Sequence, residues 1–168
     1  MNPAGAETPV AMQEPAAGAP EIWHRTCGRD VASALPFLQT LGAAFGGSRH
    51  RIHITCDAGL QLPTWVLASL DMIVSEAIAN ALEHAFPADR DGDVWVRLSE
   101  AEGRISLVIR DNGIGLPDLD HAPDSGRGLI ETLAQRLGGY ARLGSAPFGG
   151  GQVSVIFPRE VEAAGRAA

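Results

Sequence analysis

The sequence predicts an α+β fold, a two-layer α/β sandwich in which a mixed sheet carries its helices on one face. Two observations support this prediction. Helical and alternating patterns of apolar residues follow one another in the order helix, strand, long helix, two strands, glycine-rich loop, helix and strand. In addition, 45% of the 168 residues are hydrophobic, which is enough for the core of one domain.

An arm and a helix precede the predicted sheet. Residues 1–20 are rich in Ala, Pro, Gly and Glu and have almost no large apolar side chains. Burial cannot offset the entropy of ordering such a segment, so it predicts a disordered arm. Residues 21–49 predict a helical lead-in. Within it, residues 30–45 place apolar side chains at helical spacing, and Gly46 and Gly47 follow as a stop.

Residues 50–158 form the predicted domain. Alternation of apolar and polar side chains predicts four strands, at residues 51–56, 94–98, 104–110 and 153–157. Helical spacing predicts two helices, at residues 64–85 and 128–139. Glu102 and Gly103 stand between the second and third strands as a good hairpin turn. Residues 159–168 are expected to fray as a tail.

Composition argues against several classes of function. The net charge is −7 and the thirteen basic residues, all arginine, are spread along the chain, whereas a nucleic-acid surface needs a basic patch. No apolar run approaches the ~20 residues of a membrane-spanning helix, and the N-terminus does not resemble a signal peptide. We therefore expect a cytoplasmic protein without a nucleic-acid or membrane partner. Cys27 and Cys56 lack CxxC spacing and are expected to be structural thiols.

The long helix at residues 64–85 carries a polar edge that a core helix does not need. At about 100° per residue, Glu76, Asn80 and His84 fall within roughly 80° of one another beside the apolar arc. Asn80 offers a neutral oxygen ligand for Mg²⁺, which takes few protein ligands beside waters and phosphates. Glu76, one turn earlier, can orient a metal-bound water or accept a proton from an attacking group.

The end of the strand at residues 104–110 leads into a segment dense in Gly, Asp and Pro. This segment is too long and too polar for an ordinary connection, and loops of this kind are usually functional or disordered. Asp111 can present a carboxylate, which only accepts hydrogen bonds, to an exocyclic amine such as that of adenine. Gly113 and Gly115 would allow a flat base to lie close to the backbone.

A second pair of glycines opens the helix that follows. Ser125, Gly126, Arg127 and Gly128 stand at its start, where free backbone N–H groups and the helix dipole suit phosphate oxygens. Together with Asp111, this segment predicts a site for an adenine nucleotide.

These motifs resemble those of the GHKL ATP-binding family. The resemblance rests on SEAIANALEHAF as the N box, DNGIGLP as the first glycine box, and SGRGLIETLAQRLGG with GGGQVSVIFP as the second glycine box and closing strand. It covers about residues 50–158 and implies a sandwich of GHKL (Bergerat) type that binds ATP with Mg²⁺ between the helices and a lid. It implies that Glu76 is the catalytic base or orients water, that Asn80 ligates Mg²⁺, and that Asp111 contacts adenine.

Two further residues are assigned by the resemblance alone. His84 stands where many members of the family have a basic residue near the phosphates, although a histidine near a helix C-terminus also serves as a cap. Arg127 lies inside the second glycine box, where it can meet the terminal phosphate or remain an exposed arginine. Both readings stay open for each residue.

Three functions remain open within the family. NALEHAFP and LAQRLGG most resemble sensor histidine kinases of the HWE and HisKA_2 types, which implies a protein kinase of two-component or stress signalling. GRGL is also common in anti-sigma-factor serine kinases, whose partners are of sigma or anti-sigma type. A nucleotide-binding regulator without transfer chemistry is the third reading.

The phosphoacceptor is expected on another protein. A histidine kinase needs a hairpin of two long helices with its acceptor histidine, and only one helix is predicted before the first strand. His24 lacks a sustained heptad around it and is not expected to be that acceptor. The oligomeric state is left open.

Overall fold

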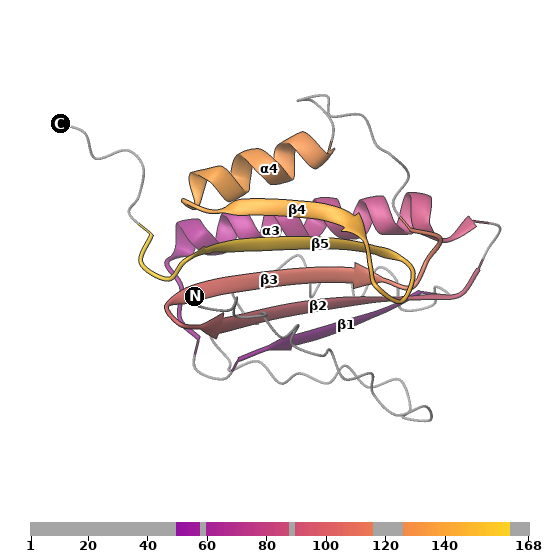
Figure 1. Cartoon of the computed structure of the whole chain (residues 1–168), viewed down its shortest axis with the longest axis horizontal. Helices are drawn as coiled ribbons and strands as arrows, with labels where there is room; N and C mark the ends of the chain where they lie inside the picture. Colours follow the sequence, from indigo (N-terminus) through magenta and orange to yellow (C-terminus); the bar gives the residue numbers. More distant parts are fainter. Residues whose placement is uncertain (1–49, 58–59, 88–89, 116–125, 162–168) are drawn as a thin grey trace, which may run out of the picture.

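The computed structural model describes residues 50–57, 60–87, 90–115 and 126–161. Its elements are strand β1 (His50–Cys56), helix α3 (Thr64–Asn80), the π-helical turn η1 (Ala81–Ala85), strands β2 (Gly92–Ala101) and β3 (Arg104–Asp111), helix α4 (Gly126–Arg136), and strands β4 (Tyr140–Ser145) and β5 (Gly151–Pro158). The strands form one layer and the two α-helices lie across one face of it (Figure 1). The predicted α/β sandwich is confirmed.

The sheet has the strand order β1-β2-β3-β5-β4 and is mixed, as predicted. β1 pairs parallel with β2, and every other neighbouring pair is antiparallel. The expected hairpin joins β2 to β3, and its turn residues Glu102 and Gly103 have φ values of 52° and 71°. Positive φ at both central residues matches the twist of the flanking strands.

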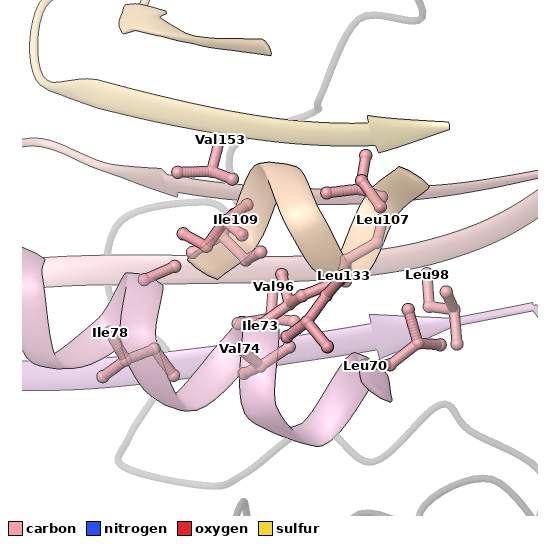
Figure 2. Packing of buried hydrophobic residues seen from close by; sticks show 14 of the residues in the cluster. Leu70, Ile73, Val74, Ile78, Val96, Leu98, Leu107, Ile109, Leu133 and Val153 are labelled. Carbon is pink, nitrogen blue, oxygen red and sulfur yellow. The ribbon is translucent and has the colours of Figure 1, made fainter. Parts of the chain in front are cut away.

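The core fills the space between the two layers (Figure 2). Alternate residues of each strand point toward the helices, so that Val96 of β2 and Ile109 of β3 are buried together with Ile73 of α3 and Leu133 of α4. Val94, Leu107 and Val155 extend the same apolar layer along the sheet. The intervening side chains of the strands lie on the opposite face of the sheet, away from α3 and α4 (Figure 1).

The long helix needs two corrections. The expected continuous α-helix over residues 64–85 changes to a π-helical turn at Ala81. The expectation that no apolar run comes near the membrane-spanning length was also wrong, because Thr64–Ala85 has 22 residues and an 18-residue window within it has a mean hydropathy of 1.4, which meets that criterion by length and composition. Its apolar face packs in the core here, since Leu70, Ile73 and Ile78 are at most 1% exposed.

Strand β4 was not predicted. Its residues alternate between exposed and half-buried, and the two that turn inward are Ala141 and Leu143. The segment carries no β-branched residue and lies at the edge of the sheet, where it pairs with β5 alone. Its weak apolar alternation explains why four strands were predicted where the structure has five.

Several predictions fall on parts of the chain that the structure does not describe. These are the arm at 1–20, the lead-in at 21–49 with His24 and Cys27, Ser125, and residues 162–168 of the tail. Within the described ranges, the thiol of Cys56 is buried, in line with the structural role expected of it.

Candidate functional site

A hollow of about 410 Å³, counted with its open mouth, lies between α3, α4 and the sheet. Its walls combine aliphatic side chains with a few polar ones; the lining residues are Ala77, Asn80, Ala81, Ile109, Asp111, Arg127, Ile130, Leu143, Gly151, Gln152 and Val153. Three residues that the sequence singled out, Asn80, Asp111 and Arg127, are therefore brought to one hollow from three elements.

Asp111 ends β3 with its side chain on the helix side of the sheet, where the residue is 5% exposed. Its Oδ1 accepts hydrogen bonds from the backbone N–H groups of Gly113 at 2.8 Å and Gly151 at 3.0 Å. Its Oδ2 accepts no hydrogen bond from the described residues. Two backbone donors thus fix the carboxyl group, and one oxygen is left to accept a hydrogen bond from a ligand.

The glycines before β5 hold Asp111 in place, a role that the sequence analysis missed. Gly150 has a φ of 82°, and a Cβ atom there would lie 1.9 Å from the carbonyl oxygen of Asp111. The chain can therefore pass close enough for Gly151 to donate to the carboxylate. The three consecutive glycines at 149–151 were the available signal, but they were read only as the start of a closing strand.

Gly113 lies close to the backbone of Ala85, whereas the sequence predicted a close approach to a bound base. A Cβ atom at Gly113 would lie 2.3 Å from the carbonyl oxygen of Ala85, and the N–H of Ile114 donates to that same oxygen at 2.9 Å. Gly113 thus joins the end of β3 to the end of η1. Gly115 has a φ of 96°, and a Cβ atom there would lie 3.6 Å from the Oγ of Ser145. Contact of a base with either glycine stays a prediction.

Glu76 and Asn80 form a linked pair on α3, one turn apart. The Nδ2 of Asn80 donates to the Oε1 of Glu76 at 3.1 Å. The start of α4 closes over this pair: a Cβ atom on Gly126 would lie 1.8 Å from the Oε1 of Glu76 and 2.8 Å from the Nδ2 of Asn80. Glycine is therefore the residue that lets the N-terminus of α4 reach the carboxylate and the amide.

The side-chain oxygens of Asn80 and Glu76 suit a hard cation that also keeps ligands from outside the protein. With Nδ2 bound to Glu76, the Oδ1 of Asn80 accepts no hydrogen bond from the described residues. Among those same residues, no group of three or more His, Cys, Asp and Glu side chains gathers to hold a metal by itself. A neutral oxygen beside one carboxylate fits Mg²⁺ that reaches the site on a phosphate ligand.

His84 lies in the π-helical turn η1, which follows Glu76 and Asn80 of α3. The wider turn of η1 changes the angle per residue after Asn80, so the α-helical spacing does not by itself relate His84 to the edge of Glu76 and Asn80. His84 is 42% exposed, its Nε2 lies 3.9 Å from the Oε2 of Glu83, and it does not line the hollow. Its contact with phosphates stays a prediction.

Arg127 and Gly128 lie in the first turn of α4. Arg127 lines the hollow, and its Nε donates to the Oε1 of Glu131 one turn later at 3.0 Å. This pairing holds the guanidinium at the wall of the hollow. The contact of Arg127 with a terminal phosphate remains to be tested.

The sequence and the fold resemble known proteins. Residues 66–161 match the family model described as histidine kinase-, DNA gyrase B- and HSP90-like ATPase. The anti-sigma F factor of Shouchella clausii is 39% identical over 56 residues, which are 33% of this chain and 38% of that protein. The sensor histidine kinase PdtaS of Mycobacterium tuberculosis is 35% identical over 69 residues, which are 39% of this chain and 14% of that protein.

A solved histidine kinase domain has a similar fold. The domain from the blue-light activated histidine kinase EL346 of Erythrobacter litoralis superposes with a TM-score of 0.64 at 23% identity, over 76% of this chain and 60% of that one. At this identity the likeness concerns the fold alone. The chain spans less than two fifths of the length of the anti-sigma factor and about one seventh of the length of the sensor kinase.

Proposed function

The chain belongs to the family of histidine kinase-, DNA gyrase B- and HSP90-like ATPases, and from this membership we propose that it binds ATP with Mg²⁺ in the hollow and transfers the γ-phosphate to another protein. The observation that carries the proposal is the placement of Asp111 and Asn80 on the wall of one hollow, each with an oxygen that accepts no hydrogen bond from the described residues.

The adenine end of the nucleotide is assigned to Asp111. The Oδ2 of Asp111 accepts a hydrogen bond from the exocyclic amine, while Oδ1 stays bound to the backbone. Ile109, Leu143 and Val153 supply apolar walls for the faces of the base. A base without this amine leaves the carboxylate unpaired, so the site favours adenine over hypoxanthine, which has a carbonyl oxygen in place of the amine.

The phosphate end is assigned to α3 and the start of α4. Asn80, through Oδ1, would hold the Mg²⁺, which when bound offsets the charge of the phosphates. The first N–H groups of α4 and the guanidinium of Arg127 face anionic oxygens with the helix dipole in the favourable sense. Glu76 accepts the proton of the attacking group, or orients it.

We place a kinase of histidine-kinase type first, acting in the cytoplasm in two-component or stress signalling. The motifs NALEHAFP at residues 80–87 and LAQRLGG at residues 133–139 support this type. A serine kinase of anti-sigma type, with a sigma or anti-sigma partner, is the second candidate. It is favoured by the 39% identity to the anti-sigma F factor.

Transfer of label from γ-labelled ATP separates these candidates. The protein is incubated with Mg²⁺ and, in parallel, with a histidine-bearing kinase hairpin and with an anti-sigma antagonist protein. Label that is lost in acid and survives alkali indicates phosphohistidine and supports the first candidate. Label that survives acid indicates phosphoserine and supports the second. ATP binding without transfer to either acceptor indicates a non-catalytic regulator, and no ATP binding at millimolar concentration overturns the proposal.

A further inference from the structure

A row of stacked side chains crosses the face of the sheet that points away from α3 and α4, behind the hollow. His53, Trp95 and Arg110 are partners in the registers of β1, β2 and β3. The rings of His53 and Trp95 stack with their centroids 5.5 Å apart and their planes at 14°. The guanidinium carbon of Arg110 lies 5.9 Å from the centroid of Trp95 and 5.7 Å from that of Phe148. Arg110 therefore joins two aromatic rings.

Among the described residues, the two aromatic rings are the contacts that hold the guanidinium of Arg110. Its Nε is buried without a hydrogen-bond partner among the described residues, and none of their carboxylates forms an ion pair with it. Phe148 in turn is 87% exposed, so the core does not hold its ring. A cation over the face of an aromatic ring within about 6 Å is attracted to it. The contact between Arg110 and Phe148 therefore fixes a side chain that the core leaves free.

Phe148 and Gly151 belong to the hairpin between β4 and β5, which lies at the end of β3 (Figure 1). Gly151 donates its N–H to the Oδ1 of Asp111 on the helix side of the sheet. Phe148 contacts Arg110 on the side away from the helices. Since Arg110 and Asp111 are consecutive in β3 and point to opposite faces, the hairpin is attached to the same strand end from both sides.

We propose that Arg110 and Phe148 form a clamp that positions Asp111 for recognition of the adenine amine. The clamp rests on the proposed function, because it acts only through Asp111. It holds the hairpin against β3, so that the N–H of Gly151 keeps the carboxylate turned for the ligand. Arg110 and Phe148 are positioning residues, and neither lines the hollow. The specificity for the base is thus set partly from the far face of the sheet.

The test compares ATP with ITP, whose base has a carbonyl oxygen in place of the amine. Titration calorimetry on wild type and Phe148→Ala gives both affinities. We expect a loss of about two- to fivefold for ATP in Phe148→Ala, the scale of an exposed cation–π contact, and no loss for ITP. Phe148→Trp keeps an aromatic ring and is expected to restore the ATP to ITP ratio. A general loosening of the fold would lower both affinities together.

Tyr140→Ala is the matched control. Tyr140 is 41% exposed and lies 5.4 Å from the guanidinium carbon of Arg142, but it stands at the other end of β4. Its removal is expected to leave the ATP to ITP ratio unchanged. An unchanged ratio in Phe148→Ala, or equal losses for both nucleotides, overturns the clamp while the proposed function stands. Wild type that binds neither nucleotide overturns the proposed function as well.

Discussion

The two carboxyl oxygens of Asp111 have different surroundings, and this difference determines the effect of a substitution. Asp111→Asn keeps an oxygen for the N–H groups of Gly113 and Gly151, so the fold should persist. The amide NH₂ then replaces Oδ2 and meets the adenine amine as a second donor. We expect ATP binding to weaken by about 1.5–3 kcal/mol, the scale for a hydrogen bond to a charged group. Titration calorimetry measures this loss.

Asp91→Asn is the control for this substitution, since Asp91 is exposed and does not line the hollow. It should bind ATP as wild type does. Unchanged ATP affinity in Asp111→Asn would mean that the base does not meet this carboxylate, and the orientation of the nucleotide in the hollow would have to be reversed.

For single residues, the sequence indicated the chemistry of the site better than it indicated the arrangement of the residues in space. Asn80 and Asp111 stand 31 positions apart in the printed sequence, and their residue types alone suggested a metal ligand and an amine acceptor. Their meeting at one hollow follows from the packing of α3 on β3. The support of Asp111 by Gly150 and Gly151 could not be predicted, because it depends on how closely two strand ends approach.

Gly126 has no Cβ atom, and this allows the start of α4 to lie close to Glu76 and Asn80 of α3. In Gly126→Ala, the new Cβ would displace the Oε1 of Glu76, the end of a flexible side chain. The fold can accept this movement, because the displaced atoms end a flexible side chain and Gly126 stands at the start of α4. We expect a melting temperature close to that of wild type, and a loss of phosphotransfer because Glu76 is turned away.

Glu76→Gln is the matching variant for this prediction. Its amide oxygen can still accept from Asn80, yet it cannot take a proton, and the expected loss of transfer is ~10²–10⁴-fold. Transfer from γ-labelled ATP and thermal unfolding are measured on both variants. Wild-type transfer by Gly126→Ala would show that the position of the carboxylate does not matter for the reaction.

An ion pair between Arg51 and Asp93 joins β1 to β2 near the start of both strands. Asp93 accepts from the guanidinium of Arg51 at 2.8 Å and 2.9 Å and lies 2.7 Å from the Nε2 of His53. The hydrogen bond from Arg51 holds the pKa of Asp93 below its ordinary value of 3.8, and His53 adds to this against the opposing effect of burial. The folded state therefore binds a proton here less readily than the unfolded chain.

Stability should follow from this difference in pKa. The contribution of Asp93 is complete above the unfolded pKa of about 3.8 and is lost as the pH falls through the lower folded pKa. We expect Asp93→Asn to destabilise the protein by about 0.5–1 kcal/mol at neutral pH, since Arg51 is largely exposed. Urea unfolding between pH 7 and acid checks this; the variant should lose less stability on acidification than wild type. Parallel curves would assign the acid sensitivity to other groups.

The elements that the sequence predicted are those with a strong apolar alternation. β2, β3 and β5 bury every second residue, so their pattern is visible in the sequence. β4 has Ala141 and Leu143 as its only inward apolar side chains and was missed. The π-turn at Ala81 has no pattern of its own, because a change from α- to π-helical hydrogen bonding leaves the sequence apolar and helical in character.

At the scale of the whole molecule, we expect a bound nucleotide to contact both the helices and the sheet and so to hold the two layers together. The hollow takes its walls from α3, α4 and three strands, so a ligand there stabilises the folded state against the unfolded chain. At ATP concentrations near 100 times the dissociation constant, the gain is about 2.7 kcal/mol. For a chain of 168 residues this corresponds to a rise in melting temperature of roughly 5–11 °C.

Differential scanning fluorimetry with and without Mg-ATP measures this rise, with the wild type, Asp111→Asn and Asp91→Asn side by side. Asp91→Asn should rise as wild type does, whereas Asp111→Asn should rise less at the same ATP concentration, because its dissociation constant is higher. A rise of equal size in all three would place the nucleotide away from Asp111. If the melting temperature of wild type does not rise at millimolar ATP, the chain keeps the fold of this ATPase family without binding its ligand. A partner protein would then be the remaining candidate for what the hollow binds.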